Sequence, residues 1–307
     1  MNTATEDRGC FLGIDLGGSC IKSVAVTREG TLLESQTIPF EDTGMQWAER
    51  IRERVRGLER RLGPATAIGL CAPGLAARDG RCIVHMPGRL QGLEGLDWRD
   101  FLGYRGPLSV LNDAHAALMG EAWIGAARGL DQIVMLTLGT GVGGAALVDG
   151  RLLRGHLGRA GHLGHITLDS RAGNDDVGTP GSLEMAIGNK TVQTRSRGRY
   201  SSTRDLVEDA RRGDPDARAL WEESVRGLAV GINTLINVLD PEAVILGGGI
   251  AEAGPFLFDL LEETLARHEW RPLGSRVRIL PARLGDMAGA HGAARQAMLL
   301  AESAEKA

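Results

Sequence analysis

The chain uses one supersecondary pattern twice, and this repeat limits the possible folds more than any other feature of the sequence. In each copy an apolar strand enters a glycine-rich turn, a second strand leaves it, and a tight glycine turn leads into a third strand. The copies are GIDLGGSCIKSVAVTREGTLL, from Gly13, and LTLGTGVGGAALVDGRLL, from Leu136. The repeat predicts two similar α/β lobes, each a mixed sheet with flanking helices, with a cleft between them.

Hydrophobic periodicity and turn residues predict the elements around the repeat. Strands are expected at 10–16, 21–27, 31–39, 67–71, 108–111, 132–138, 145–148, 243–246 and 275–280. Helices are expected at 43–62, 114–123, 182–188, 203–212, 217–239, 256–268 and 289–301. The polar, basic stretch 190–202 is expected to be a mobile segment. For the domains we expect a disordered tail over 1–8, an N-terminal lobe over 9–117 completed by a C-terminal helix over 291–307, and a C-terminal lobe over 118–290.

The composition is that of a soluble globular protein, since 43% of the 307 residues are hydrophobic, 24% are charged and the net charge is −4. Basic side chains are scattered and aromatic residues make up 4%, so no nucleic-acid partner is expected. No apolar run is long enough to cross a bilayer, and the polar N-terminus has no signal core, so no membrane association is expected. The four cysteines form no CxxC pair, which favours free thiols in a reducing cytoplasm.

A carboxylate stands at a strand–helix junction in the segment PLSVLNDAHAA, which starts at Pro107. Asn112 and Asp113 follow a short apolar run and precede a helical one, where side chains reach the carboxyl edge of a sheet. A lone carboxylate between two glycine-rich turns suggests a base that activates a hydroxyl for phosphoryl transfer. The alternative is that Asp113 only caps its helix.

The glycine turns themselves allow two interpretations. Gly139-x-Gly141-x-x-Gly144 matches the dinucleotide fingerprint, but a strand follows it instead of the required helix, so we reject that interpretation. No GxxxxGK[ST] run occurs either, which excludes a P-loop. Turns of this kind can still bind phosphate through bare backbone N–H groups, and Thr140 could add a hydroxyl. The alternative is that both turns are only tight hairpins.

Two other groups of polar residues need interpretation. Asp15 and Lys22 flank Gly17-Gly18-Ser19, and a carboxylate beside a phosphate loop most often binds Mg²⁺, directly or through water. His156, His162 and His165 suggest metal spacing, but they lie in a predicted loop without a nearby cysteine. Sugar hydroxyls or structural hydrogen bonds are better partners for these histidines than a metal ion.

Five motifs then occur in a characteristic order: Asp15-x-Gly17-Gly18-Ser19-x-x-Lys22, Asn112-Asp113-Ala114, Gly139-Thr140-Gly141-x-Gly143-Gly144, Asp240-Pro241-Glu242 through Gly249, and Leu284-Gly285-Asp286 through Gly292-Ala293. Together they resemble the ROK proteins (repressors, open reading frames and sugar kinases) of the actin/hexokinase-like superfamily, over Cys10 to about Ala301. The resemblance implies the two-lobed actin-like (ribonuclease H-like) ATPase fold.

The resemblance also implies ATP-dependent phosphorylation of a hexose 6-hydroxyl, with Asp113 as the general base and Mg²⁺ near Asp15. Sugar-binding positions of the family match Asn112, Asp113, His162, His165 and Glu184. Nucleotide- and phosphate-binding positions match Asp15, Gly17, Gly18, Ser19, Lys22, Gly139, Thr140, Gly141, Gly143, Gly247, Gly248 and Gly249. The expected partners are a hexose or N-acetylhexosamine and a nucleotide, and the expected assembly is a cytoplasmic homodimer.

The first departure from the family pattern concerns a zinc loop. The family has three cysteines where this chain has Asp175, Val177 and Ser182, so no structural zinc is expected. His165 then lacks the metal that would orient its ring, and another group must fix its tautomer.

Two further departures concern the sugar. His162 stands where sugar kinases of the family usually have glutamate, and it resembles some N-acetylmannosamine kinases, which favours a 2-acetamido sugar. Met86-Pro87-Gly88-Arg89-Leu90 replaces a Pro-Asn-Leu run. The alternatives are a glucokinase-type enzyme, a non-catalytic sugar-sensing protein, and a repressor. Repressors of the family have a helix-turn-helix before the first phosphate motif, and about nine residues precede Cys10 here, so we expect an enzyme.

Overall fold

The computed structural model describes residues 9–306, and these form two compact units. Unit 1 contains the chain up to Gly129, Arg154–Ala160 and the segment from Arg283 onward, whereas unit 2 contains Leu130–Leu153 and Gly161–Ala282. This division differs from the expected boundaries at 117 and 291, because the helix that begins at Asp113 continues without a break and stays in unit 1. The expected tail over 1–8 lies outside the described residues.

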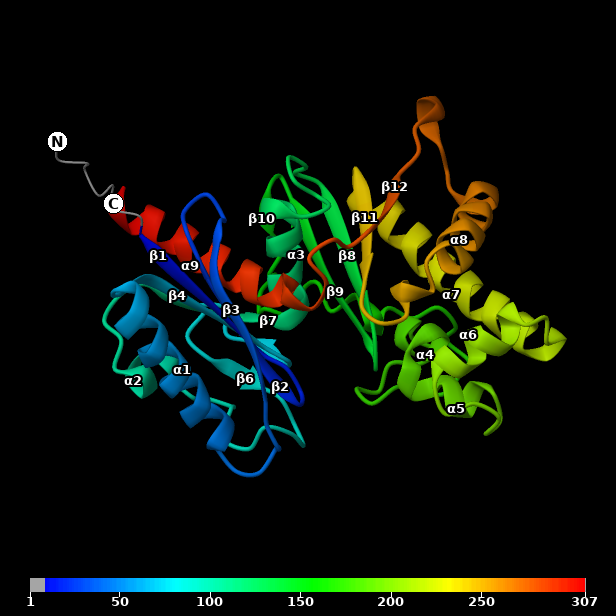
Figure 1. Cartoon of the computed structure of the whole chain (residues 1–307). Coiled ribbons are helices and arrows are strands. Elements are labelled where there is room, and N and C mark those ends of the chain that lie inside the picture. The colour runs from blue at the N-terminus through cyan, green and yellow to red at the C-terminus, as the bar shows by residue number, and fades with distance from the viewer. Residues whose placement is uncertain (1–8, 307) are drawn as a thin grey trace. The chain divides into compact units, whose positions relative to one another are not determined.

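Unit 1 contains a five-stranded mixed sheet of order β3-β2-β1-β4-β7 (Figure 1). Strands β1, β2 and β3 are antiparallel neighbours, and β4 and β7 continue the sheet parallel to β1. Its strands are β1 (Cys10–Leu16), β2 (Cys20–Val26), β3 (Leu32–Pro39), β4 (Ala65–Ala72) and β7 (Leu108–Asn112), with a separate small pair β5 (Leu75–Ala76) and β6 (Ile83–His85). Its α-helices are α1 (Gln46–Leu62), α2 (Trp98–Leu102), α3 (Asp113–Ile124) and α9 (Ala288–Glu305).

Alternation along β1 gives each face of this sheet a different helix. Leu12 and Ile14 belong to a buried cluster with Trp47 and Ile51 of α1. Phe11 points to the other face, where it packs with small residues of α9. Helix α9 can lie close to this second face because a β-carbon at Gly13 of β1 or at Gly69 of β4 would overlap a carbonyl oxygen of α9. Asp15 follows Gly13 with a period of two, so its side chain also faces α9.

Unit 2 repeats the same sheet, in the order β10-β9-β8-β11-β12, which confirms the two-copy architecture predicted from the repeat. Again the first three strands are antiparallel and the last two run parallel to the central one. Its strands are β8 (Ile133–Leu138), β9 (Val142–Val148), β10 (Arg151–Leu152), β11 (Ala243–Gly247) and β12 (Arg278–Pro281). Its helices are α4 (Leu183–Ile187), α5 (Val192–Arg195), α6 (Thr203–Arg211), α7 (Pro215–Leu239) and α8 (Pro255–His268). Strand β9, the second strand of the repeat in this unit, begins at Val142, directly after the glycine turn, and not at 145 as expected.

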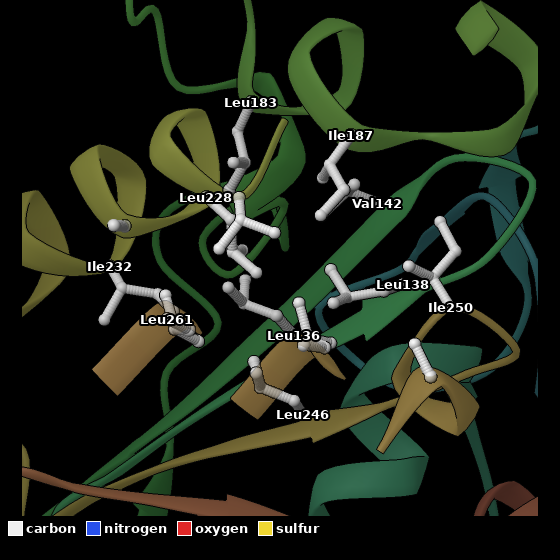
Figure 2. Packing of buried hydrophobic residues seen from close by; sticks show 14 of the residues in the cluster. Leu136, Leu138, Val142, Leu183, Ile187, Leu228, Ile232, Leu246, Ile250 and Leu261 are labelled. Carbon is white, nitrogen blue, oxygen red and sulfur yellow. The ribbon is translucent and has the colours of Figure 1, made fainter. Parts of the chain in front are cut away.

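Larger aliphatic side chains fill the core of unit 2 (Figure 2). Leu136 and Leu138 of β8 and Leu246 of β11 project toward Leu228 and Ile232 of the long helix α7. The segment 190–202, expected to be mobile, contributes the buried side chains of Val192 and Tyr200 to this core and contains α5. The expectation was wrong because two apolar residues within a polar stretch are enough to anchor it.

Candidate active site

The predicted site residues fall into two groups, one in each unit. The unit 1 group lies at the carboxyl ends of β1 and β7 and contains Asp15, Lys22 and the Asn112–Asp113 junction. The unit 2 group surrounds the glycine turn 139–141 between β8 and β9. In both units the groups lie where strands end and backbone N–H groups become available to a ligand.

Asn112, not Asp113, is the N-cap of α3. The side-chain oxygen of Asn112 accepts hydrogen bonds from the N–H groups of Ala114 at 3.0 Å and His115 at 3.3 Å, and its amide donates to the Gly74 carbonyl. Asn112 is buried, whereas Asp113 is exposed. The carboxylate of Asp113 accepts one hydrogen bond from Ala114 N–H at 2.8 Å, but the cap does not depend on it. Asp113 is therefore an exposed carboxylate at the carboxyl end of β7, and Asn112 is the residue that caps the helix.

Asp15 lies in an environment that is buried and negatively charged. Burial, and then the charge of Asp113, raise the pKa of the Asp15 carboxyl to about 6, against the opposing effects of Lys22 and of a hydrogen bond from the Cys71 thiol. Lys22 is the cross-strand partner of Asp15, and its Nζ lies 3.6 Å from a carboxylate oxygen of Asp286. Besides burial, the charges of Asp113 and Asp286 raise the pKa of Asp15, and that of Lys22 lowers it.

The first glycine turn, Gly17-Gly18-Ser19, has a contact that sequence reasoning missed. The guanidinium of Arg89 donates to the Gly18 carbonyl oxygen at 2.9 Å, and a β-carbon at Gly18 would overlap it. Arg89 belongs to the Met86–Leu90 segment, whose departure from the family pattern was the available signal. The side chain is exposed, so a positive charge lies beside the predicted phosphate turn.

The second glycine turn and the turn at Gly247-Gly248-Gly249 come together within unit 2. Gly248 has a φ of +85°, and Ile250 N–H donates to the Leu138 carbonyl at 3.0 Å, which places this turn against the end of β8. A cavity of about 440 Å³ opens between them, a size that suits a small ligand. It is lined by Gly139, Thr140, Asn189, Ser202, Thr203, Arg204, Val207, Glu208, Arg211, Gly249, Ile250, Glu252 and Ala253.

Glu184 forms a hydrogen bond at the end of the second glycine turn. Its Oε2 accepts the N–H of Val142 at 2.8 Å, and a β-carbon at Gly141 would overlap this oxygen. Its Oε1 forms an ion pair with Lys190, which also lies 2.7 Å from Asp176. Partial burial opposes the charge on Lys190, but these two carboxylates raise its pKa. Lys190 was not predicted as a site residue, and the contacts of Glu184 with Val142 and Lys190 are structural.

The histidine segment lies against β9. Gly164 permits the close approach, since a β-carbon there would overlap the Val142 carbonyl. His162 is half-buried before the short 3₁₀ turn Leu163–His165. Nδ1 of His165 lies 2.8 Å from Oδ2 of Asp175, which, like Arg89 and Lys190, was not predicted as a site residue. Within residues 9–306 no group of three or more His, Cys, Asp or Glu side chains is arranged to hold a metal ion.

Two such α/β units, each with a glycine turn between its first two strands, are characteristic of proteins with the actin-like fold. A model of the ROK family matches residues 11–299. A glucokinase of Thermotoga maritima is 31% identical over 309 residues, covering 92% of this chain and 96% of the relative. The ROK hexokinase of Thermus thermophilus has the same fold, with a TM-score of 0.85 and 32% identity over 96% of this chain and 99% of that one.

A further solved structure, the ROK glucokinase of Streptomyces griseus in complex with glucose and AMPPNP, gives a TM-score of 0.78. It is 27% identical, covering 95% of this chain and 100% of that one. The protein described here belongs to the ROK family, and its fold is the actin-like fold predicted from the sequence.

Proposed function

We propose that this protein is an ATP-dependent sugar kinase that phosphorylates the 6-hydroxyl of a hexose or a 2-acetamido hexose, with Asp113 as general base. The observation that carries the proposal is the exposed carboxylate of Asp113 at the carboxyl end of β7, with the capping role taken by Asn112. The similarity to sugar kinases, one of them in complex with glucose and an ATP analogue, supports the choice of substrates.

Each group of the site has a part in this reaction. Asp113 accepts the proton of the attacking hydroxyl, which raises the nucleophilicity of the oxygen as the phosphoryl group arrives. The glycine turns 17–19 and 139–144 contact the phosphates through backbone N–H groups, and Thr140 adds its hydroxyl. The cavity beside Gly249 receives the nucleoside. Asn112, His162, His165 and Glu184 bind sugar hydroxyls.

We infer that Asp15 of unit 1 takes part in holding Mg²⁺. Burial, and then the charge of Asp113, raise the pKa of Asp15, and a cation close to this carboxylate would oppose both effects. Oxygen donors of this type suit Mg²⁺, which Asp15 would hold through a water molecule. When bound, the ion neutralises charge on the phosphates.

Two further features belong to the proposal. We infer that the enzyme works in the cytoplasm, because all four cysteines are free thiols and three of them have pKa values raised by burial, which keeps them unreactive. Within the described part of the chain no helix has the length and apolarity to cross a bilayer. We also infer a homodimer, which light scattering coupled to size-exclusion chromatography would test.

The decisive experiment is a coupled ADP-release assay with glucose, mannose, N-acetylglucosamine and N-acetylmannosamine at saturating MgATP. We expect turnover with at least one of these sugars and the highest kcat/KM for N-acetylmannosamine, because neutral His162 offers both a donor and an acceptor. A preference for glucose would leave the kinase proposal intact and overturn the 2-acetamido assignment. No ADP release with any of the four, in protein that binds one of them calorimetrically, would favour a sugar-sensing protein instead.

A further inference from the structure

The loop between His165 and Ser182 is organised around one carboxylate, that of Asp175. The Asp175 side chain has an exposed fraction of 0%, although its neighbours Asp176 and Val177 are exposed. Its Oδ1 accepts the backbone N–H groups of Val177 at 3.1 Å and Thr179 at 2.8 Å. Four donors reach this carboxylate in all, because the ring of His165 and the hydroxyl of Ser182 also hydrogen-bond to it.

Backbone hydrogen bonds complete the loop around this centre. Asp175 N–H donates to the Thr179 carbonyl at 2.9 Å, and Gly181 N–H donates to the Gly173 carbonyl at 2.8 Å. Leu183 N–H donates to the Ile166 carbonyl at 3.0 Å, which ties the end of the loop to the residue after His165. The loop therefore has a defined shape that side-chain and backbone hydrogen bonds account for.

The donor set does not fit the structural zinc that the family resemblance implies at these positions. Zinc in such loops is bound by thiolates and imidazoles, whereas the three matching positions here are Asp175, Val177 and Ser182. A valine side chain offers no lone pair, and a neutral hydroxyl is a poor zinc ligand. Both oxygens of Asp175 already accept hydrogen bonds from N–H groups. At these positions the chain therefore has no set of metal ligands, and the Asp175 carboxylate accepts hydrogen bonds instead.

We propose that Asp175 is a positioning residue that takes the place of a metal ion and fixes the orientation and tautomer of His165. A carboxylate oxygen 2.8 Å from Nδ1 requires the proton on that nitrogen, so in the neutral ring Nε2 is a hydrogen-bond acceptor. The His165 side chain is 29% exposed, and its Nδ1 contacts a fully buried carboxylate, so Nε2 is the ring nitrogen that remains for a ligand. Nε2 therefore accepts a hydrogen bond from a sugar hydroxyl, a role that rests on the proposed function.

The test compares Asp175→Asn with the matched control Asp169→Asn. Both remove one negative charge from the same loop, but the Asp169 side chain is 57% exposed and has local contacts, a hydrogen bond from Arg171 N–H at 2.9 Å and an ion pair with the Arg171 guanidinium at 3.8 Å. Asparagine at 175 can still accept from Val177 and Thr179 through its oxygen, whereas its NH₂ group would face Nδ1 and favour the Nε2–H tautomer. ¹⁵N NMR of the imidazoles, with His165→Gln to assign the signal, reports the tautomer directly without any substrate.

We expect the Nδ1–H tautomer in the wild type and in Asp169→Asn, and its loss in Asp175→Asn. In the ADP-release assay, KM for the sugar should rise about tenfold in Asp175→Asn, with KM for ATP and kcat changed less than about threefold, since one contact to a bound hydroxyl is lost. Treatment with EDTA followed by Mg²⁺ should leave the tautomer and the melting temperature of the wild type unchanged.

Three results would overturn the proposal: stoichiometric zinc in protein purified without chelator, an Nε2–H tautomer in the wild type, or the same response from both variants. The failure of the kinase proposal would be distinguishable from these. A wild-type Nδ1–H tautomer that Asp175→Asn abolishes, in a protein that phosphorylates no sugar, would support the contact and overturn only its assignment to a sugar hydroxyl.

Discussion

In unit 1 the hairpin β1–β2 pairs Asp15 with Lys22 one step before the glycine turn, whereas the equivalent pair in the hairpin β8–β9 of unit 2 is Thr137 with Gly143. The pairs nearest the turns, Leu16 with Ile21 and Leu138 with Val142, are apolar in both hairpins. The two hairpins are therefore alike in the apolar pair beside the turn. They differ in the next pair, which is Asp15 with Lys22 in unit 1 and Thr137 with Gly143 in unit 2. The pair one step from the turn is thus charged in unit 1 and uncharged in unit 2, where a cavity opens beside the turn.

The two units also treat a buried carboxylate in opposite ways. Burial and the charge of Asp113 raise the pKa of Asp15 in unit 1 to about 6. In unit 2 burial acts in the same sense on Asp175, but the hydrogen bonds from His165, Thr179, Ser182 and Val177 outweigh it and lower the pKa to about 2. Burial raises the pKa of both carboxyls, but several hydrogen-bond donors outweigh it at Asp175, whereas at Asp15 the charge of a second carboxylate adds to it.

The largest effect should come from Asp113→Asn. Without a general base the kcat for sugar phosphorylation should fall by about 10²–10⁴-fold, because the hydroxyl proton then has no acceptor. Sugar binding measured by calorimetry should stay close to that of the wild type, since the amide keeps the shape of the carboxyl. Full activity in this variant would remove Asp113 from the mechanism.

Next in size is the effect of Gly69→Ala on the stability of unit 1. The new β-carbon would overlap the carbonyl of Ala293, so α9 must shift, at a cost of about 3 kcal/mol in the free energy of unfolding. The control is Gly57→Ala in α1, where only arginine side chains lie near the new atom at ordinary contact distance. That substitution should stabilise the protein by about 0.5–1 kcal/mol, measured by urea denaturation. Equal effects from both would contradict the close packing of α9.

The third prediction concerns the pH dependence of stability. The native state holds the Asp15 proton more tightly than the unfolded chain, so stability should fall as the pH rises from about 4 to about 6, by about 2–3 kcal/mol. In Asp15→Asn this fall should be absent. Asp175 has the opposite sign: its contribution is present above about pH 4 and lost as the pH falls toward 2. Chemical denaturation of the wild type, Asp15→Asn and Asp175→Asn between pH 2 and 7 measures these slopes, and parallel curves would refute the contrast.

The smallest effect is expected from Thr140→Ala in the turn of unit 2. Losing one hydroxyl beside the cavity should raise KM for ATP by about 3–10-fold, as expected for a single hydrogen bond. Thr140→Ser keeps the hydroxyl and should restore the wild-type KM. If serine behaves like alanine, the threonine acts through its methyl group and packing, and not as a phosphate ligand.

The repeat, the glycine turns and the strand–helix junction at Asp113 were predictable from the sequence because each is a local pattern of apolar periodicity and turn residues. The same local logic was wrong for 190–202, where Val192 and Tyr200 anchor a polar stretch to a core built from distant elements. It also placed the second strand of the repeat too late, because glycines within Val142–Val148 suggested a turn where the structure has a strand.

By itself the sequence determined two α/β units, their family and the positions of their turns, since these depend on residues close together in the chain. Only the tertiary structure decided which groups surround each side chain. Arg89 reaches Gly18 across 71 positions, Glu184 reaches Val142 across 42, and Asp175 reaches His165 across a loop of ten. Proton affinity, ring tautomer and the room for a β-carbon depend on such neighbours, and no local pattern records them.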